Sequence, residues 1–254
     1  MVSIITLSRQ SVWRVFLLLC LPACLVAQDL PADDSEFHFT RMAFGVYGRT
    51  PTNNPDEPWL RDWPDAEDHF LQGVKRLTLL NIGESRAASL LDDSIFEYPV
   101  AYAVKVGYWE LSREEIDRLR EYLVRGGFLI VDDFHGPEEW AQFMSSIQRV
   151  FPGRAFVEIP DDHEIFHVHF DLDDRKQIPG AQAILNGVTM EHRLGVPEYW
   201  RGIYDDAGRL VVAINFNMDM GDAWEHADDA FYPEPLTALA YRVGINYIIY
   251  SMTH

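Results

Sequence analysis

Side chains able to do acid–base chemistry follow a short apolar segment near the middle of the chain. A Gly-Gly pair opens the apolar run Phe128–Val131, and Asp132, Asp133 and His135 come directly after it. Such a run predicts a buried parallel strand, and open α/β sheets bind ligands at the carboxyl ends of their strands. Because adjacent carboxylates repel each other, one aspartate either keeps a proton or binds a cation or a base. In the alternative interpretation, Asp133 caps the following helix and Asp132 accepts hydrogen bonds from loop amides.

A second group of candidate ligands lies at residues 161–169 and combines histidines with acidic residues. If this segment is extended, His167 and His169 share one face, since side chains repeat every two residues along a strand. Together with Asp162 they form a candidate site for zinc, manganese or iron. His163 is a candidate ligand-binding residue. Alternatively, the segment is a polar strand whose imidazoles satisfy buried backbone groups.

A third group of acidic residues also follows an apolar strand and precedes a predicted helix that begins near Asp222. In the functional interpretation, Asp219 and Glu225 or His226 face the same crevice as Asp132 and His135. In the alternative, these acids cap the helix and are stabilised by its dipole.

Two further candidates are single residues. Arg41 lies at the end of the first predicted strand, where it could bind an anion or pair with Asp132. Glu198 precedes Tyr199 and Trp200, whose rings could stack on a sugar or a peptide, although aromatic residues beside an apolar strand are more often part of the core. We therefore include Arg41 and Glu198 among the candidate ligand-binding residues.

Alternating strands and helices are expected to position these groups. The pattern predicts strands at 37–41, 77–81, 101–106, 128–131, 155–159, 200–204 and 209–215, and helices at 65–76, 112–125, 137–150 and 235–250. Ser112 and Glu115 form a capping box, and Gly126 ends that helix. Residues 161–198 read as an irregular excursion. This order predicts an α/β domain with a mainly parallel sheet, helices on both faces and flavodoxin-like topology.

The first 27 residues are typical of a secretory signal peptide, with Arg9 and Arg14 before an apolar stretch and Ala27 before the expected cleavage site. We expect residues 28–36 to be a linker and 37–254 to be a single domain. The segment 21–24 also resembles a bacterial lipobox, in which Cys24 would carry a lipid anchor. Both interpretations predict export to the periplasm or cell envelope, without a transmembrane span in the mature chain.

Cysteine usage and missing motifs exclude several classes of chemistry. The only two cysteines, Cys20 and Cys24, lie in the predicted leader, which excludes disulfides, thiolate metal sites and a cysteine nucleophile from the mature domain. The chain has no G-x-G-x-x-G, G-x-x-x-x-G-K-[ST] or G-x-S-x-G motif. Nucleotide-dependent and serine-hydrolase functions are therefore disfavoured.

The chain is strongly acidic, with a formal net charge of −19 at pH 7. Such a surface repels nucleic acid and anionic lipid, so no nucleic-acid partner is expected. The acidity favours solubility. It is also compatible with binding a divalent metal or a basic partner.

A resemblance to a known family rests on a series of short motifs, namely Phe37–Arg41, Trp63–Ala66, Tyr98–Pro99, Leu119–Phe128, Asp132–Asp133, Asp162–Phe166, Gly208–Arg209, Gly244–Asn246 and Tyr250. In this combination the chain resembles the bacterial family called domain of unknown function 4159. The resemblance implies a fold similar to class I glutamine amidotransferases. It also implies a cell-envelope assembly role, because relatives often occur in or beside bacterial gene groups that contain membrane-associated von Willebrand factor A proteins and an AAA ATPase. Amidotransferases need a cysteine nucleophile, which this mature chain lacks.

Three functions follow as expectations. The leading one is an exported, non-catalytic amidotransferase-like domain that binds a small polar ligand or an envelope protein partner. The competing one is a metal-assisted hydrolase or isomerase acting on a carbohydrate, in which His167, His169 and an aspartate hold the metal and Asp133 or Glu164 is the general base. In the third, the acidic surface docks onto a basic envelope protein.

Overall fold

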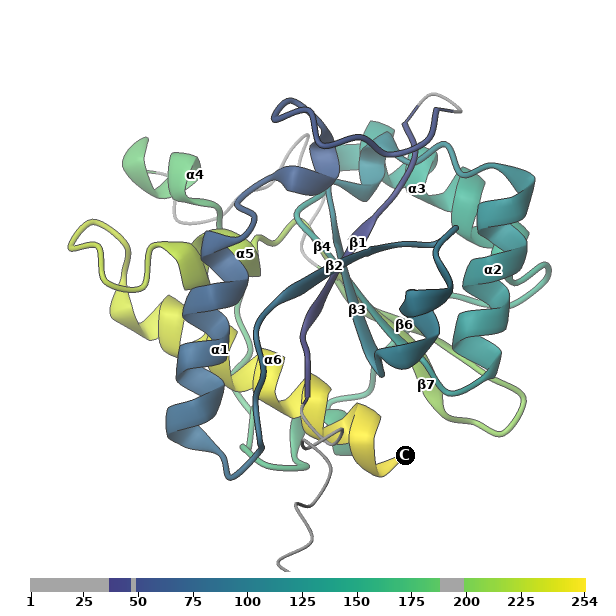
Figure 1. Cartoon of the computed structure of the whole chain (residues 1–254). Helices are drawn as coiled ribbons and strands as arrows, with labels where there is room; N and C mark the ends of the chain where they lie inside the picture. Colours follow the sequence, from purple (N-terminus) through teal and green to yellow (C-terminus); the bar gives the residue numbers. More distant parts are fainter. Residues whose placement is uncertain (1–36, 47–48, 188–198) are drawn as a thin grey trace, which may run out of the picture. The chain divides into compact units, whose positions relative to one another are not determined.

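A seven-stranded sheet forms the centre of the computed structural model, which describes residues 37–46, 49–187 and 199–254 (Figure 1). The strands are β1 (Thr40–Ala43), β2 (Arg86–Ser89), β3 (Val100–Val104), β4 (Phe128–Asp132), β5 (Val157–Glu158), β6 (Tyr199–Tyr204) and β7 (Leu210–Phe216). Their order across the sheet is β2-β1-β3-β4-β7-β6-β5. Strands β1 to β4 and β7 are parallel, whereas β6 and β5 run antiparallel at one edge.

Helices cover both faces of this sheet (Figure 1). The α-helices are α1 (Asp65–Leu77), α2 (Arg113–Val124), α3 (Gly136–Val150), α4 (Ala181–Leu185), α5 (Met220–Glu225) and α6 (Glu234–Thr253). Short 3-10 helices are η1 (Pro58–Leu60), η2 (Asp93–Glu97), η3 (Val106–Tyr108) and η4 (Glu164–Phe166). Helices α1, α5 and α6 pack on one face, and α2 and α3 pack on the other. The predicted α/β class, with a mostly parallel sheet of the flavodoxin-like kind, is confirmed.

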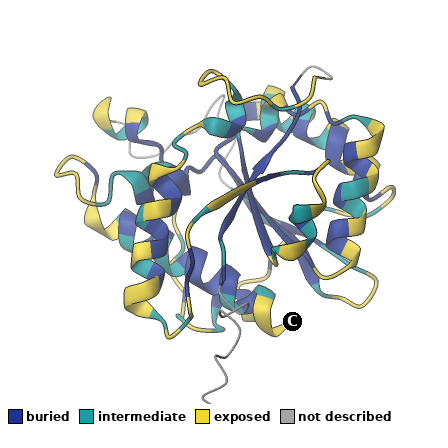
Figure 2. Cartoon of the chain, in the orientation of Figure 1, coloured by how far each residue is buried: buried dark blue, intermediate teal, exposed yellow. Residues whose placement is uncertain are grey.

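The central strands are buried on both faces, which explains why their sequences are continuously apolar (Figure 2). Successive side chains of β4 alternate between two cores. Phe128 and Ile130 belong to the core beneath α1, α5 and α6, whereas Leu129 and Val131 belong to the core beneath α2 and α3.

The predicted capping box of α2 is confirmed and links the helix to the sheet. Ser112 Oγ accepts a hydrogen bond from the Glu115 amide at 3.2 Å, and Glu115 Oε2 accepts one from the Ser112 amide at 2.8 Å. Glu115 Oε1 also accepts a hydrogen bond from the amide of Gly45, just beyond β1, at 3.0 Å. Gly126 follows the helix with a φ of 111°, a conformation that favours glycine.

Two expectations about secondary structure are wrong. The apolar segment 77–81 is not a strand: Leu77 ends α1 and Leu79 is fully exposed. The strand in this part of the chain is β2, which apolar periodicity misses because it lies at the sheet edge with Arg86 exposed. The excursion forms η4 and α4 with no strand between 160 and 187, so His167 and His169 are not on an extended segment.

The predicted signal peptide, its lipid-anchor alternative and the linker at 28–36 lie outside the described residues. Within the described ranges, none of the helices is both long and apolar enough to cross a membrane.

Candidate functional site

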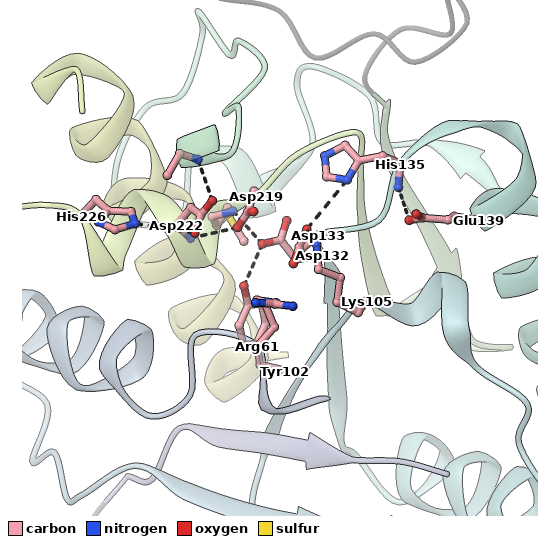
Figure 3. A network of polar contacts seen from close by, with 12 residues as sticks. Arg61, Tyr102, Lys105, Asp132, Asp133, His135, Glu139, Asp219, Asp222 and His226 are labelled. Carbon is pink, nitrogen blue, oxygen red and sulfur yellow. Dashed lines mark hydrogen bonds and ion pairs between the residues drawn. The ribbon is translucent and has the colours of Figure 1, made fainter. Parts of the chain in front are cut away.

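Acidic side chains meet at the carboxyl edge of the sheet, where the parallel strands end. Strands β3, β4 and β7 are neighbours, and Lys105, Asp133 and Asp219 follow them in turn. Asp62 joins them from the loop before α1. One carboxylate oxygen each from Asp62, Asp133 and Asp219 lies within 4.8 Å of the others. We call these three residues the carboxylate cluster; Figure 3 shows two of them, Asp133 and Asp219, and Lys105 next to Asp133.

Asp133 is the most enclosed member of the cluster, with only 1% of its surface exposed. Its Oδ1 accepts a hydrogen bond from Lys105 Nζ at 2.6 Å and lies 3.8 Å from His135 Nδ1 (Figure 3). Its Oδ2 is buried and has no hydrogen-bond donor among the residues that the structure describes. The N-cap of α3 is His135, so Asp133 does not occupy the capping position.

Asp219 combines two roles that the sequence left as alternatives. Its Oδ1 accepts a hydrogen bond from the Asp222 amide at 2.9 Å and so caps α5. The same side chain, 5% exposed, is a member of the carboxylate cluster. The capping interpretation is therefore right for Asp219 and does not remove it from the candidate site.

Asp132 lies next to the cluster and connects three elements. Its Oδ2 accepts hydrogen bonds from the Tyr102 hydroxyl and from the Met220 amide, both at 2.7 Å. Burial raises the pKa of Asp132 to about 6, while the hydrogen bond from Tyr102 acts in the opposite direction. Asp132 thus joins β4 to β3 and to the start of α5, as the loop-amide interpretation predicted in part.

Arg41 acts on the site indirectly. It is fully buried, and its Nε donates to Glu67 Oε1 at 2.5 Å. Its Nη1 donates to the carbonyl oxygens of Trp59 and Arg61 at 2.9 and 2.7 Å. The ion pair is with Glu67 rather than with the predicted partner Asp132. Because the two carbonyls precede Asp62, Arg41 holds the loop that brings Asp62 to the cluster.

Left-handed backbone conformations concentrate at this edge. The non-glycine residues with positive φ in the described part of the chain are Asp62, Lys105, Asp133 and Asn217, at 60°, 53°, 52° and 58°. The first three contribute side chains to the site, and Asn217 lies two residues before Asp219. Such conformations cost energy and cluster at functional sites, which favours a binding or catalytic role for this edge.

The carboxylates perturb one another. Burial, followed by the carboxylates of Asp222, Asp133 and Glu225, raises the pKa of Asp62 to about 8, while Arg41 acts in the opposite direction. Burial is also the main cause of the raised pKa values of Asp133 and Asp219. Lys105 remains protonated, because its pKa is raised by Asp133 and Asp219 despite burial. The folded protein thus pays a free-energy cost for ionising the cluster.

We expect the stability of the metal-free protein to fall as the pH rises from 5 to 8.5. The pKa of Asp62 is about 8 in the folded state and about 3.9 in an unfolded chain, so stability is fully present below the unfolded value and is lost as pH rises toward the folded value. The expected loss is on the order of 4 kcal/mol, or roughly 8–16 °C in Tm. Thermal unfolding in buffers with EDTA measures it. Asp62→Asn should make the fall of Tm with pH smaller. A Tm that rises between pH 5 and 8.5 would contradict a raised pKa of Asp62.

The remaining predicted residues are not brought to this edge. His163 Nδ1 accepts a hydrogen bond from the Ile165 amide at 3.1 Å, and its ring packs against Tyr204 and Tyr250. Tyr204 pairs with Leu210, the first residue of β7. His163 therefore lies where the parallel strands begin, at the opposite end of these strands from the carboxylate cluster.

The predicted metal ligands do not form a group in the structure. His167 Nδ1 lies 3.1 Å from Asp171 and its Nε2 lies 2.8 Å from the Asp161 carbonyl, whereas the ring of His169 packs on Phe170. Asp162 joins neither histidine in a metal-binding arrangement of described residues. Glu198 lies outside the described residues.

Glu225 belongs to a second, more exposed acidic group with Asp222 and His226. Two of its members have partners within the chain: Asp222 Oδ2 accepts from the Ala181 amide at 2.6 Å, and His226 Nδ1 lies 2.8 Å from Asp229. The carboxylate cluster, with a buried oxygen that lacks a donor, is the stronger candidate.

Lys105, Tyr102, Glu67 and Asp62 are the site residues that sequence reasoning missed. Lys105 directly follows an apolar run, as Asp132 does, and the same rule would have found it. Asp62 lies in a loop with no periodic pattern, so no local signal marks it.

The fold and this edge define an α/β domain of the flavodoxin-like class with an acidic candidate site where its parallel strands end. The chain belongs to the family described as Domain of unknown function (DUF4159), whose profile matches residues 43–252. The resemblance to this family is thereby confirmed. No curated protein matches the chain.

Proposed function

We propose that this chain is a non-catalytic, amidotransferase-like domain that binds a small polar ligand with a cationic group at the carboxylate cluster. One observation carries the proposal: three carboxylates, of which Asp133 and Asp219 are buried and Asp62 is half-buried, lie within 4.8 Å of one another, and among the described residues one ammonium group, that of Lys105, bonds to them. This excess of negative charge attracts a cation. Described residues contain no cysteine, which supports binding over thiol catalysis.

The strand order supports the amidotransferase-like part of the proposal. The parallel strands β2-β1-β3-β4-β7 follow the flavodoxin-like order, in which ligands bind beyond the carboxyl ends of the strands. The cluster occupies that position. The cysteine nucleophile of true amidotransferases would have no counterpart here.

We further propose that residues 1–27 direct export to the periplasm or cell envelope, where the domain at 37–254 meets a protein partner. The leader pattern and the net charge of −19 support this role, since an acidic surface suits a basic partner. Intact-mass measurement of the exported protein tests the leader. A chain that begins at Gln28 supports signal-peptide cleavage, a lipid-modified Cys24 supports the anchor, and an uncleaved chain contradicts both.

Calorimetric titration with glucosamine, and with glucose as its uncharged counterpart, tests ligand binding. We expect glucosamine to bind at least about 10-fold more tightly than glucose, a difference of about 1.4 kcal/mol, because its ammonium group pairs with the cluster. Asp219→Asn should remove this preference while keeping the cap of α5, and Asp174→Asn, at an exposed position, should keep it. Equal binding of both sugars, or a preference that survives Asp219→Asn, would overturn the proposal.

The second candidate is metal-assisted hydrolysis or isomerisation of a carbohydrate. The proximity of Lys105 and His135 to Asp133 favours it, because these groups could donate and accept protons. Turnover of a carbohydrate that is lost in His135→Gln, with the fold intact by circular dichroism, would support catalysis over simple binding. Turnover that His135→Gln leaves unchanged would contradict a role for this site.

A further inference from the structure

We propose that the carboxylate cluster binds one hard divalent cation, of the magnesium, calcium or manganese class, through one oxygen each of Asp62, Asp133 and Asp219. The inference rests on the proposed binding of cations at this cluster. It adds a metal ion to the cations that the cluster binds. It assigns a site that differs from the histidine group of residues 162–169 in position and in ligand chemistry.

The spacing of the three carboxylates suits a single ion. Their ligand oxygens all lie within 4.8 Å of one another. Two oxygens on opposite sides of one ion are about 4.1 Å apart for magnesium and roughly 4.6–5.2 Å apart for calcium, and neighbouring ligands are closer. The cluster can therefore reach a common ion with small adjustments of the side chains.

The charge balance calls for a divalent rather than a monovalent species. The ionised cluster carries three negative charges, and the ammonium group of Lys105, bonded to Asp133, offsets one of them. The buried guanidinium of Arg41 is paired with Glu67, whose carboxylate already balances its charge. One divalent cation would neutralise the remainder and remove the repulsion among the carboxylates.

An independent observation indicates that Asp133 has a binding partner outside the protein. Asp133 Oδ2 is buried and has no hydrogen-bond donor in the described part of the chain, although the other oxygen of the same carboxylate is paired with Lys105. Buried polar atoms almost always have a partner, and an unpaired one calls for an ion or a water molecule. A cation between Asp133 and the other two aspartates would provide that partner.

The ligand chemistry selects the class of metal. All three ligands are carboxylate oxygens, which suit magnesium, calcium and manganese better than zinc or copper. The nearest imidazole, that of His135, lies 3.8 Å from Asp133 Oδ1 and contacts a ligand rather than the cluster as a whole.

Asp62→Asn is the sharpest variant for a test. Asparagine has the same size and tolerates the left-handed backbone at position 62, so the variant should fold. It removes one ligand charge and leaves the ion pair between Lys105 and Asp133 intact. Asp174→Asn serves as the matched control, because it removes one negative charge from an exposed position outside the cluster.

Purified protein is freed of metal with EDTA, exchanged into chelator-free buffer and titrated calorimetrically with MnCl₂, MgCl₂ and CaCl₂, and Tm is followed in parallel. We expect one ion to bind per chain and to raise Tm. Asp62→Asn should weaken binding at least about 10-fold and should melt higher than wild type without metal, because one repelling carboxylate is gone. Asp174→Asn should bind like wild type.

The absence of one-to-one binding by all three cations, or equal affinity of wild type and Asp62→Asn, would overturn the inference. The glucosamine titration separates this failure from that of the proposed function. If glucosamine binds in a manner dependent on Asp219 and the divalent cations do not bind, the cation inference fails and the binding function stands. If neither probe binds, both fail.

Discussion

Arg41→Ala lowers the free energy of unfolding by about 3–5 kcal/mol, equivalent to roughly 6–20 °C in Tm. Arg41 and Glu67 are both completely buried, so removing the guanidinium leaves an unpaired carboxylate in the core. The carbonyl oxygens of Trp59 and Arg61 lose their donor in the same variant. Chemical denaturation monitored by circular dichroism measures the loss.

Two comparisons identify the cause. The double variant Arg41→Met with Glu67→Leu removes both charges and should recover most of the stability, since replacing a buried ion pair by apolar side chains is often nearly neutral. Arg113→Ala breaks a surface pair in which Arg113 is 92% and Asp117 is 54% exposed, and we expect a change below about 1 kcal/mol. A loss in Arg41→Ala as small as that in Arg113→Ala would contradict the role of Arg41 in holding the loop.

Asp132→Ala is expected to cost about 2–5 kcal/mol of unfolding free energy. The Tyr102 hydroxyl and the Met220 amide both donate to Asp132 Oδ2, and both residues are fully buried, so neither donor can turn to water. Urea denaturation at pH 8 measures the effect, since the pKa of about 6 keeps Asp132 ionised there.

A double-mutant cycle with Tyr102→Phe tests the origin of this cost. Tyr102→Phe removes one donor, so the two substitutions together should cost less than the sum of their separate effects by at least about 0.5 kcal/mol. Strict additivity, or a cost below about 1 kcal/mol for Asp132→Ala, would show that the buried carboxylate does not join β3, β4 and α5.

The carboxyl edge could be predicted because one local rule marks it. Asp132, Asp133 and Asp219 each follow an apolar strand, and parallel strands must end at the same edge of the sheet. Lys105 obeys the same rule and was missed, because the expected strand extended to Val106 whereas β3 ends at Val104. An error of two residues at the end of a strand was enough to leave out Lys105, the cation that bonds to Asp133.

Long-range contacts explain what could not be predicted. Asp62 reaches the cluster through hydrogen bonds from Arg41 to the carbonyls of a loop some twenty residues away. Local patterns carry no information about such contacts. His163 illustrates the converse, because the irregular segment around it runs along the opposite edge, where it meets Tyr204 and Tyr250. Neither periodicity nor composition indicates at which end of the parallel strands an irregular segment lies.

A carboxyl ¹³C NMR titration of the aspartate side chains with MgCl₂ and with glucosamine shows most directly whether ligands bind at the carboxyl edge. If the carboxyl edge is the binding site, the largest shift changes will occur at Asp62, Asp133 and Asp219, and they will saturate together. Largest changes at Asp222 and Glu225, or small unsaturable changes spread over the exposed acids, would contradict it.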